Sequence, residues 1–190
     1  SDDTDAIERL EIQEGTALMY PLSSMGAHVS VCPNHAVGRN TPFKTRGYVA
    51  LAGTFGYELD ITKLSEEERK IIPHQIELYK KYSDIVRNGD YWRIASYSEN
   101  HEFDCWACIS TDKNKALITF VQFLNHPNFK KRFIKVKGIC AESNYLVHYL
   151  DDEQNSKPLE LKGSTIINAG IPVSRDWGDF QGKLIYLEKK

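Results

Sequence analysis

Residues 89–190 contain a series of short segments rich in aromatic and β-branched residues, separated by polar turn sequences. The segments are 91–95, 103–110, 116–124, 132–136, 145–150, 159–161 and 183–187, with turn sequences at 111–114, 126–128 and 151–155. Short strands at regular spacing with polar turns are typical of antiparallel sandwiches. This part of the chain is therefore predicted to be an all-β domain.

Residues 1–88 show a different pattern, in which candidate helices and strands alternate. Helices are predicted from Ala6 onward, over 45–52 and from Ser65 to about residue 87, with strands over 27–31 and 57–61. Two pairs three residues apart, Asp5 with Glu8 and Ser65 with Glu68, fit a capping box, in which each side chain bonds the other residue's free amide. Segment 27–31 is short, apolar and bounded by turn residues, like a buried strand of a parallel sheet. The first part is therefore predicted to be α/β, with a domain boundary near residue 89.

The composition limits the classes of partner. The net charge of the 190 residues is −2, and 41% of the residues are hydrophobic. Nucleic acid and anionic membranes both need a concentrated basic surface, so neither is expected as the main partner. No apolar run approaches the ~20 residues of a membrane span.

The four cysteines are expected to be free thiols in a reducing compartment, which predicts a cytoplasmic protein. Cys105 and Cys108 form a CxxC pattern, which can serve redox chemistry or supply half a zinc site. They lie in a predicted strand, where residues three apart point to opposite faces. No second CxxC and no HxxxH pair completes a ligand set. Two buried small hydrophobic residues are the favoured interpretation.

Three carboxylates, Asp2, Asp3 and Asp5, fall within the first five residues, and no initiator methionine precedes them. Taken alone, such residues are most often solvated terminal residues or helix caps. Termini are usually disordered unless something ties them down, and a helix follows here at once. This start therefore predicts a chain cut from inside a larger protein, close to a functional acid.

A series of motifs runs through the chain: DDTDAIERL at 2–10, MGAHVS at 25–30, PNH at 33–35, GR at 38–39 and AGTFGYELD at 52–60, then GDYWR at 89–93, KGI at 137–139 and WGDF at 177–180. In this order they resemble the bacterial α-galactosidases of glycoside hydrolase family 36. That family has an N-terminal β-domain, a central (β/α)₈ barrel and a C-terminal antiparallel β-domain. The resemblance implies that residues 1–88 are the last units of a TIM barrel and that residues 89–190 are the C-terminal β-sandwich domain.

The resemblance also implies a catalytic role for Asp2. The family cleaves terminal α-galactosyl groups with retention, and its general acid/base aspartate lies in an S-D-[DN]-T-D segment that aligns with Asp2. A neighbouring carboxylate such as Asp3 raises the pKa of an acid, which helps it to hold its proton near neutral pH. Retention needs a second carboxylate as nucleophile, about 5–5.5 Å away. The family has it upstream, and nothing here matches it, so the chain alone is expected to be inactive.

The remaining polar residues are interpreted conservatively. His28, Cys32, His35 and Arg39 could line a pocket or hold a metal, but hydrogen-bonded scaffolding is favoured, with Asp3 and Asp5 as loop and cap residues. Ala36 stands where the family commonly has glutamine. The resemblance implies no cofactor and no metal.

The partners implied by the resemblance are α-galactoside oligosaccharides of the raffinose and melibiose type, and the intact parent is expected to be a homo-oligomer. The alternative is a non-catalytic carbohydrate-binding or structural β-sandwich module with a barrel remnant attached.

Overall fold

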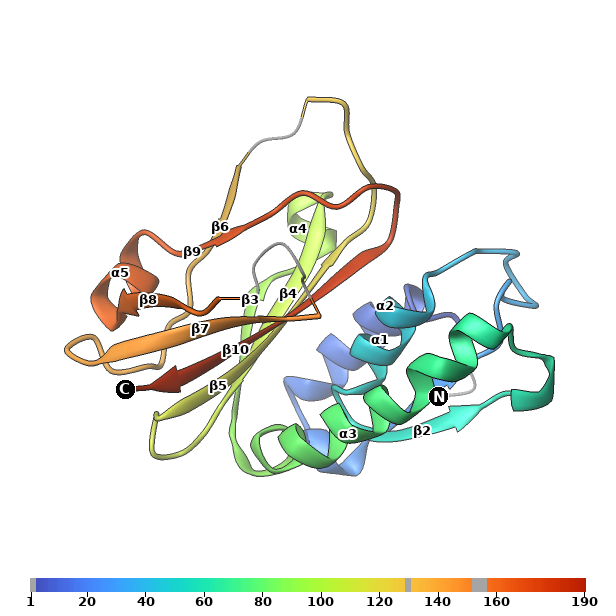
Figure 1. Cartoon of the computed structure of the whole chain (residues 1–190), viewed down its shortest axis with the longest axis horizontal. Coiled ribbons are helices and arrows are strands. Elements are labelled where there is room, and N and C mark those ends of the chain that lie inside the picture. Colours follow the sequence, from blue (N-terminus) through green and yellow to red (C-terminus); the bar gives the residue numbers. More distant parts are fainter. Residues whose placement is uncertain (1–2, 129–130, 152–156) are drawn as a thin grey trace. The chain divides into compact units, whose positions relative to one another are not determined.

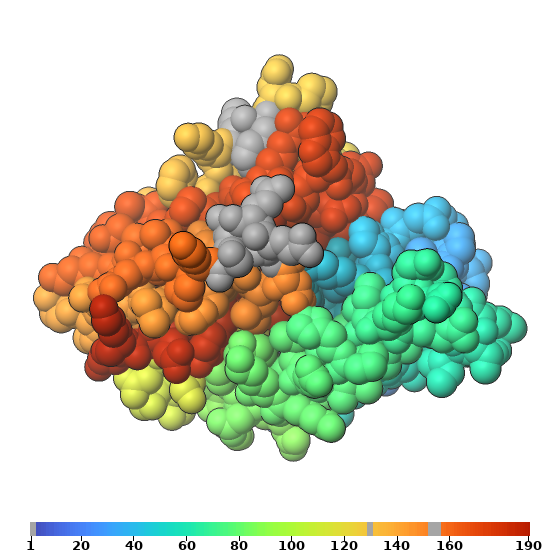
Figure 2. All heavy atoms as spheres, in the orientation of Figure 1, coloured from blue at the N-terminus to red at the C-terminus, as the bar shows by residue number. Residues whose placement is uncertain are grey.

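The computed structural model describes residues 3–128, 131–151 and 157–190. The chain divides into two compact units, Ser1–Arg87 and Asn88–Lys190. Figure 1 shows helices in the blue-to-green part of the chain and mainly strands in the yellow-to-red part. With all heavy atoms drawn, side chains fill the spaces between the ribbons of each unit on the face shown in Figure 2.

The first unit is built around a β–α–β element. Strands β1 (Gly26–Ser30) and β2 (Thr54–Glu58) pair in parallel, and α2 (Phe43–Ala50) lies between them in the chain. Helix α1 (Glu8–Ala17) precedes β1 and α3 (Glu66–Asn88) follows β2, with 3-10 turns at η1 (Leu22–Ser24) and η2 (Ile61–Lys63). The core joins β1 to α2 through Ala27, Val29, Phe43 and Ala50. The predicted parallel strand at 27–31 is thus confirmed.

The two predicted capping boxes have different outcomes. At α3 both bonds form: Glu68 N donates to Ser65 Oγ at 3.1 Å, and Ser65 N donates to Glu68 Oε2 at 3.3 Å. At α1 only half forms, because Glu8 N donates to Asp5 Oδ1 at 3.0 Å while the Asp5 amide donates to Asp3 Oδ1 at 2.8 Å. Asp3 thus takes the role predicted for the Glu8 carboxylate, and α1 begins at Glu8 rather than Ala6.

The second unit contains a six-stranded antiparallel sheet in the order β3-β4-β5-β10-β7-β8. These strands are β3 (Asp90–Ala95), β4 (Phe103–Ile109), β5 (Lys115–Gln122), β7 (Asn144–Leu150), β8 (Leu159–Lys162) and β10 (Gln181–Lys189). Two short helices accompany them, α4 (Tyr97–Asn100) and α5 (Gly163–Asn168). The antiparallel strands predicted for this part are confirmed.

The layer packed on this sheet is smaller than the sandwich prediction implies. It contains a two-stranded antiparallel ribbon of β6 (Arg132–Ile134) and β9 (Ile171–Val173), together with α5. Ile134, Ile166, Ile171 and Val173 from this layer share one core with residues of β4, β5, β7 and β10. No helix in the described parts of the chain has both the length and the apolar composition needed to cross a membrane.

The CxxC cysteines are buried within this unit. Cys105 and Cys108 lie on β4, each 1% exposed, and only Cys105 belongs to the shared core. Burial raises the pKa of Cys105 well above its usual value and that of Cys108 to about 12. The interpretation as two buried small hydrophobic residues is confirmed.

Candidate functional site

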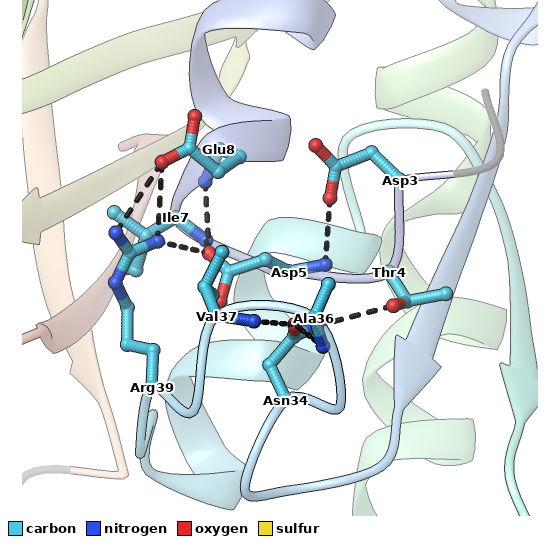
Figure 3. Close-up of polar contacts among 9 residues, drawn as sticks. All are labelled: Asp3, Thr4, Asp5, Ile7, Glu8, Asn34, Ala36, Val37 and Arg39. Carbon is cyan, nitrogen blue, oxygen red and sulfur yellow. Dashed lines mark hydrogen bonds and ion pairs between the residues drawn. The ribbon is translucent and has the colours of Figure 1, made fainter.

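The predicted acid/base residue Asp2 lies outside the described residues, which begin again at Asp3 on its C-terminal side. What the structure describes is the support of that position: residues 3–8, termed the acidic segment, and the 32–40 loop, which contacts it (Figure 3).

Arg39 of the loop binds both carboxylates at the start of α1. Its Nη1 donates to Asp5 Oδ1, and its Nη2 lies 3.3 Å from Glu8 Oε1. Asp5 is 3% exposed and also accepts the amides of Ile7 at 2.9 Å and Glu8 at 3.0 Å. Asp5 is therefore a helix cap, as predicted, and in addition one half of a buried ion pair.

Asn34 of the loop holds the residue before Asp5. Its Nδ2 donates to Thr4 Oγ1 at 3.1 Å, and the ring of His35 lies 3.5 Å from the same oxygen. The carbonyl oxygen of the Asn34 side chain accepts the amides of Ala36 at 2.9 Å and Val37 at 3.1 Å. One amide group thus closes a turn in the loop with its oxygen and binds the acidic segment with its nitrogen.

The 32–40 loop is also closed through its backbone. The Asn34 amide donates to Arg39 O at 2.9 Å, and the Gly38 amide donates to Asn34 O at 2.8 Å. Gly38 has φ +67°, the left-handed conformation that glycine adopts without strain. Asn34 and Arg39, the two residues that bind the acidic segment, are thus fixed to each other.

Arg9 binds the acidic segment from the other side. Its Nη1 donates to Asp3 O at 3.3 Å and its Nη2 to Gly26 O, at the start of β1, at 2.7 Å. Burial lowers the pKa of Arg9, and the charges of Asp3 and Glu58 oppose that shift. The backbone of Asp3 is therefore tied to the first residue of the strand.

Arg46 fixes the two ends of the loop. This buried side chain on α2 donates from Nη1 to Ser30 O at 2.6 Å, and from Nε to Thr41 O at 3.0 Å. Its Nη2 donates to Glu68 Oε1 at 2.7 Å. The end of β1 and the residue that follows the loop are therefore joined through one guanidinium group.

The four loop and strand residues singled out in the sequence all make polar contacts. Besides Arg39 and His35, Cys32 Sγ donates to Asn40 Oδ1 at 3.7 Å, and His28 Nδ1 lies 3.5 Å from Glu58 Oε2. Across the described ranges, no three His, Cys, Asp or Glu side chains are grouped so that they could hold a metal ion. The hydrogen-bonded scaffolding role is the one these contacts fit.

Sequence reasoning gives no role to Arg9, Asn34 or Arg46. The signal for Asn34 is present, because asparagine after proline and before glycine favours a side-chain-closed turn. For Arg9 and Arg46 no local signal exists, since their partners are backbone carbonyls 17 and 16 residues away.

Two family models match the chain. Residues 1–89 match the family described as Melibiase, and residues 103–187 match the glycosyl hydrolase family 36 C-terminal domain. Together they cover most of the sequence and leave only the start of the second unit and its last residues unmatched.

Three relatives are similar in sequence. The bifunctional α-galactosidase/sucrose kinase AgaSK of Mediterraneibacter gnavus is 41% identical over 91% of this chain and 18% of its own length. The α-galactosidase AgaA of Geobacillus stearothermophilus is 44% identical over 79% of this chain and 20% of its own. For α-galactosidase Mel36A of Lactobacillus acidophilus the values are 38%, 99% and 24%. The chain thus spans a quarter or less of these relatives.

Solved structures agree with the sequence matches. The galactosidase domain of AgaSK superposes on all of this chain with a TM-score of 0.91 and 38% identity, using 25% of its own length. An AgaA structure from Geobacillus stearothermophilus in complex with raffinose superposes with a TM-score of 0.92 and 36% identity, again over 100% of this chain and 25% of that one. The chain belongs to glycoside hydrolase family 36, and it matches the C-terminal part of the family's α-galactosidases.

Proposed function

We propose that this chain is the C-terminal portion of a retaining α-galactosidase, with residues 1–88 forming the last units of its (β/α)₈ barrel and residues 89–190 its C-terminal β-domain. The observation that carries the proposal is the superposition of the whole chain on α-galactosidase structures at 36–38% identity. The parallel β1–α2–β2 element supports the barrel assignment, since a barrel is a succession of such units.

In this proposal Asp2 is the general acid/base. It protonates the glycosidic oxygen while a second carboxylate, supplied by another part of the protein, attacks the anomeric carbon and forms a galactosyl ester. The leaving sugar departs with that proton. Asp2, now ionised, then takes a proton from water, which hydrolyses the ester and restores both groups. The barrel places such residues at the C-terminal ends of its strands, where loops lead into helices.

The substrate class follows from the relatives. Raffinose is bound in one of the superposed α-galactosidase structures and stachyose in another. We therefore expect the intact protein to hydrolyse terminal α-galactosyl groups of raffinose- and melibiose-type sugars, in the cytoplasm and as a homo-oligomer. This chain without the second carboxylate is expected to be inactive.

The test is hydrolysis by the whole protein that contains this sequence. Melibiose and raffinose should release galactose, and proton NMR should detect the α-anomer first, as retention requires. Asp2→Asn should lower kcat/KM for melibiose by about 10²–10⁴-fold. A whole protein that binds α-galactosides and hydrolyses none would instead identify a carbohydrate-binding module.

A further inference from the structure

Three successive residues next to Asp2 are each held by a different side chain. Arg9 binds the carbonyl oxygen of Asp3, Asn34 binds the hydroxyl group of Thr4, and Arg39 binds the carboxylate of Asp5. Figure 3 shows the contacts of the loop residues Asn34 and Arg39 with the acidic segment. From this arrangement we infer that Arg39 is a positioning residue for the Asp2 carboxyl group, acting through Asp5; the inference rests on the proposed function of Asp2.

Capping of α1 does not require Arg39. The Asp5 carboxylate already accepts two amides, those of Ile7 and Glu8, which is what a helix cap needs. Arg39 adds a charged partner from 34 residues further along the chain. Burial lowers the pKa of Arg39, but the hydrogen bond and charge of Asp5, with those of Glu8, outweigh this and raise it. The additional contact fixes the acidic segment to the loop.

The loop provides a rigid support for that contact. Arg39 is bonded through its carbonyl oxygen to the Asn34 amide, and Asn34 binds Thr4. Arg46 then joins Ser30, which ends β1, to Thr41, just beyond the loop. The chain of contacts therefore runs from β1 through the loop to Asp5. Since consecutive Cα atoms lie about 3.8 Å apart, fixing residues 3–5 limits the positions that the Asp2 backbone can take.

The position of a general acid matters only where a proton must reach the leaving group. The acid has to lie within hydrogen-bond reach of the glycosidic oxygen, and a misplacement of about 1 Å can cost about 10²-fold in rate. Melibiose has a sugar leaving group that must be protonated. A dinitrophenyl α-galactoside has an acidic phenol that departs without a proton. Loss of positioning should therefore affect the first substrate and spare the second.

The experiment compares kcat/KM for these two substrates in the whole protein, because kcat/KM reports the step that breaks the glycosidic bond. Arg39→Gln should lower the value for melibiose by about 10²-fold and leave that for the aryl galactoside nearly unchanged. Arg39→Lys keeps the charge without the forked geometry and should recover part of the loss. The matched control is Arg132→Gln, which removes the ion pair with Glu102 in the second unit and should change neither value.

Asp2→Asn in the same assays separates the two proposals. If it reduces both substrates equally or neither, the assignment of Asp2 as the acid is wrong. If it reduces melibiose selectively while Arg39→Gln and Arg39→Lys reduce both substrates equally, or neither, Asp2 is the acid and the positioning role of Arg39 is overturned. If Arg39→Gln does not fold, the Lys variant decides: a selective loss on melibiose supports the inference, and a uniform loss contradicts it.

Discussion

Glu68 and Arg46 form an ion pair that connects the start of α3 to the end of β1. Glu68 Oε1 accepts Arg46 Nη2 at 2.7 Å, while Oε2 accepts the Ser65 amide of the capping box. Arg46 in turn donates to Ser30 O, the last residue of β1. One carboxylate therefore caps a helix and balances a buried guanidinium group that supports the 32–40 loop.

Replacement of Arg46 by methionine should destabilise the first unit strongly. Methionine keeps much of the apolar volume, but it leaves the carbonyl groups of Ser30 and Thr41 without their donor, at about 1–3 kcal/mol for each buried group. Urea unfolding of the whole protein should show the loss in the free energy of unfolding. Lys70→Gln, which removes an ion pair with Glu66 in which both side chains are 72% exposed, is the control and should change little. Equal effects of both variants would contradict this role of Arg46.

Gly138→Ala should destabilise the second unit, because residue 138 has φ +85° and an added Cβ would lie 2.6 Å from Cε2 of Trp92. The left-handed conformation and the clash together predict a loss of at least about 2 kcal/mol. The matched control is Gly15→Ala in α1, where nothing lies within 4 Å of an added Cβ. That change should stabilise the helix by about 0.5–1 kcal/mol. Thermal unfolding of both variants would show shifts of opposite sign, and shifts of the same sign would contradict the argument.

Most strands of the second unit can be predicted from the sequence because their signal is local. Alternating apolar residues and polar turns define β4 and β5 within a residue or two of their observed ends. Strand β9 has no such signal, because Ile171–Val173 is only three residues long and contains a proline. Its extended form depends on pairing with β6, where Phe133 faces Pro172. Pairing between distant segments is not written in either segment alone.

The predicted strand at 57–61 lies three residues too late for a related reason. Gly53 and Gly56 suggest a turn, yet β2 runs through Thr54–Glu58 in register with β1. An added Cβ at Gly53 would lie 2.6 Å from the Met25 carbonyl oxygen, so this glycine serves a close backbone approach rather than a turn. In a sequence the two uses of glycine look alike.

The candidate site shows the same limit. Asp5 as a cap and Arg39 as scaffolding can be predicted, because capping residues and turn residues have local patterns. Arg9 and Arg46 cannot, since a buried arginine has the same letter as an exposed one. Only the distant carbonyl groups of Gly26 and Ser30 make their burial possible.

The cysteines should differ in reactivity in a way that depends on pH. Alkylation requires the thiolate. The pKa of Cys140 is lowered, chiefly by a hydrogen bond with the Ser143 side chain, whereas burial raises that of Cys108 to about 12. Iodoacetamide near pH 7 should therefore modify Cys140 well before Cys105 or Cys108, as mass spectrometry of the peptides would show. Modification of Cys105 or Cys108 as fast as Cys140 in the folded protein would refute the burial argument, and unfolding in urea should remove the difference.

Two substitutions at Asp5 should separate its capping role from its charge. Asn keeps an oxygen that can accept the amides of Ile7 and Glu8, but it loses the charge that pairs with Arg39. Ala loses both functions and leaves a buried site without an acceptor. We expect Asp5→Ala to lower the free energy of unfolding by about 1–3 kcal/mol and Asp5→Asn to lower it less. Added salt screens a buried pair only weakly, so the difference between the variants should persist at high ionic strength. Equal losses in urea unfolding would mean that the ion pair, rather than the cap, provides the stability at this position.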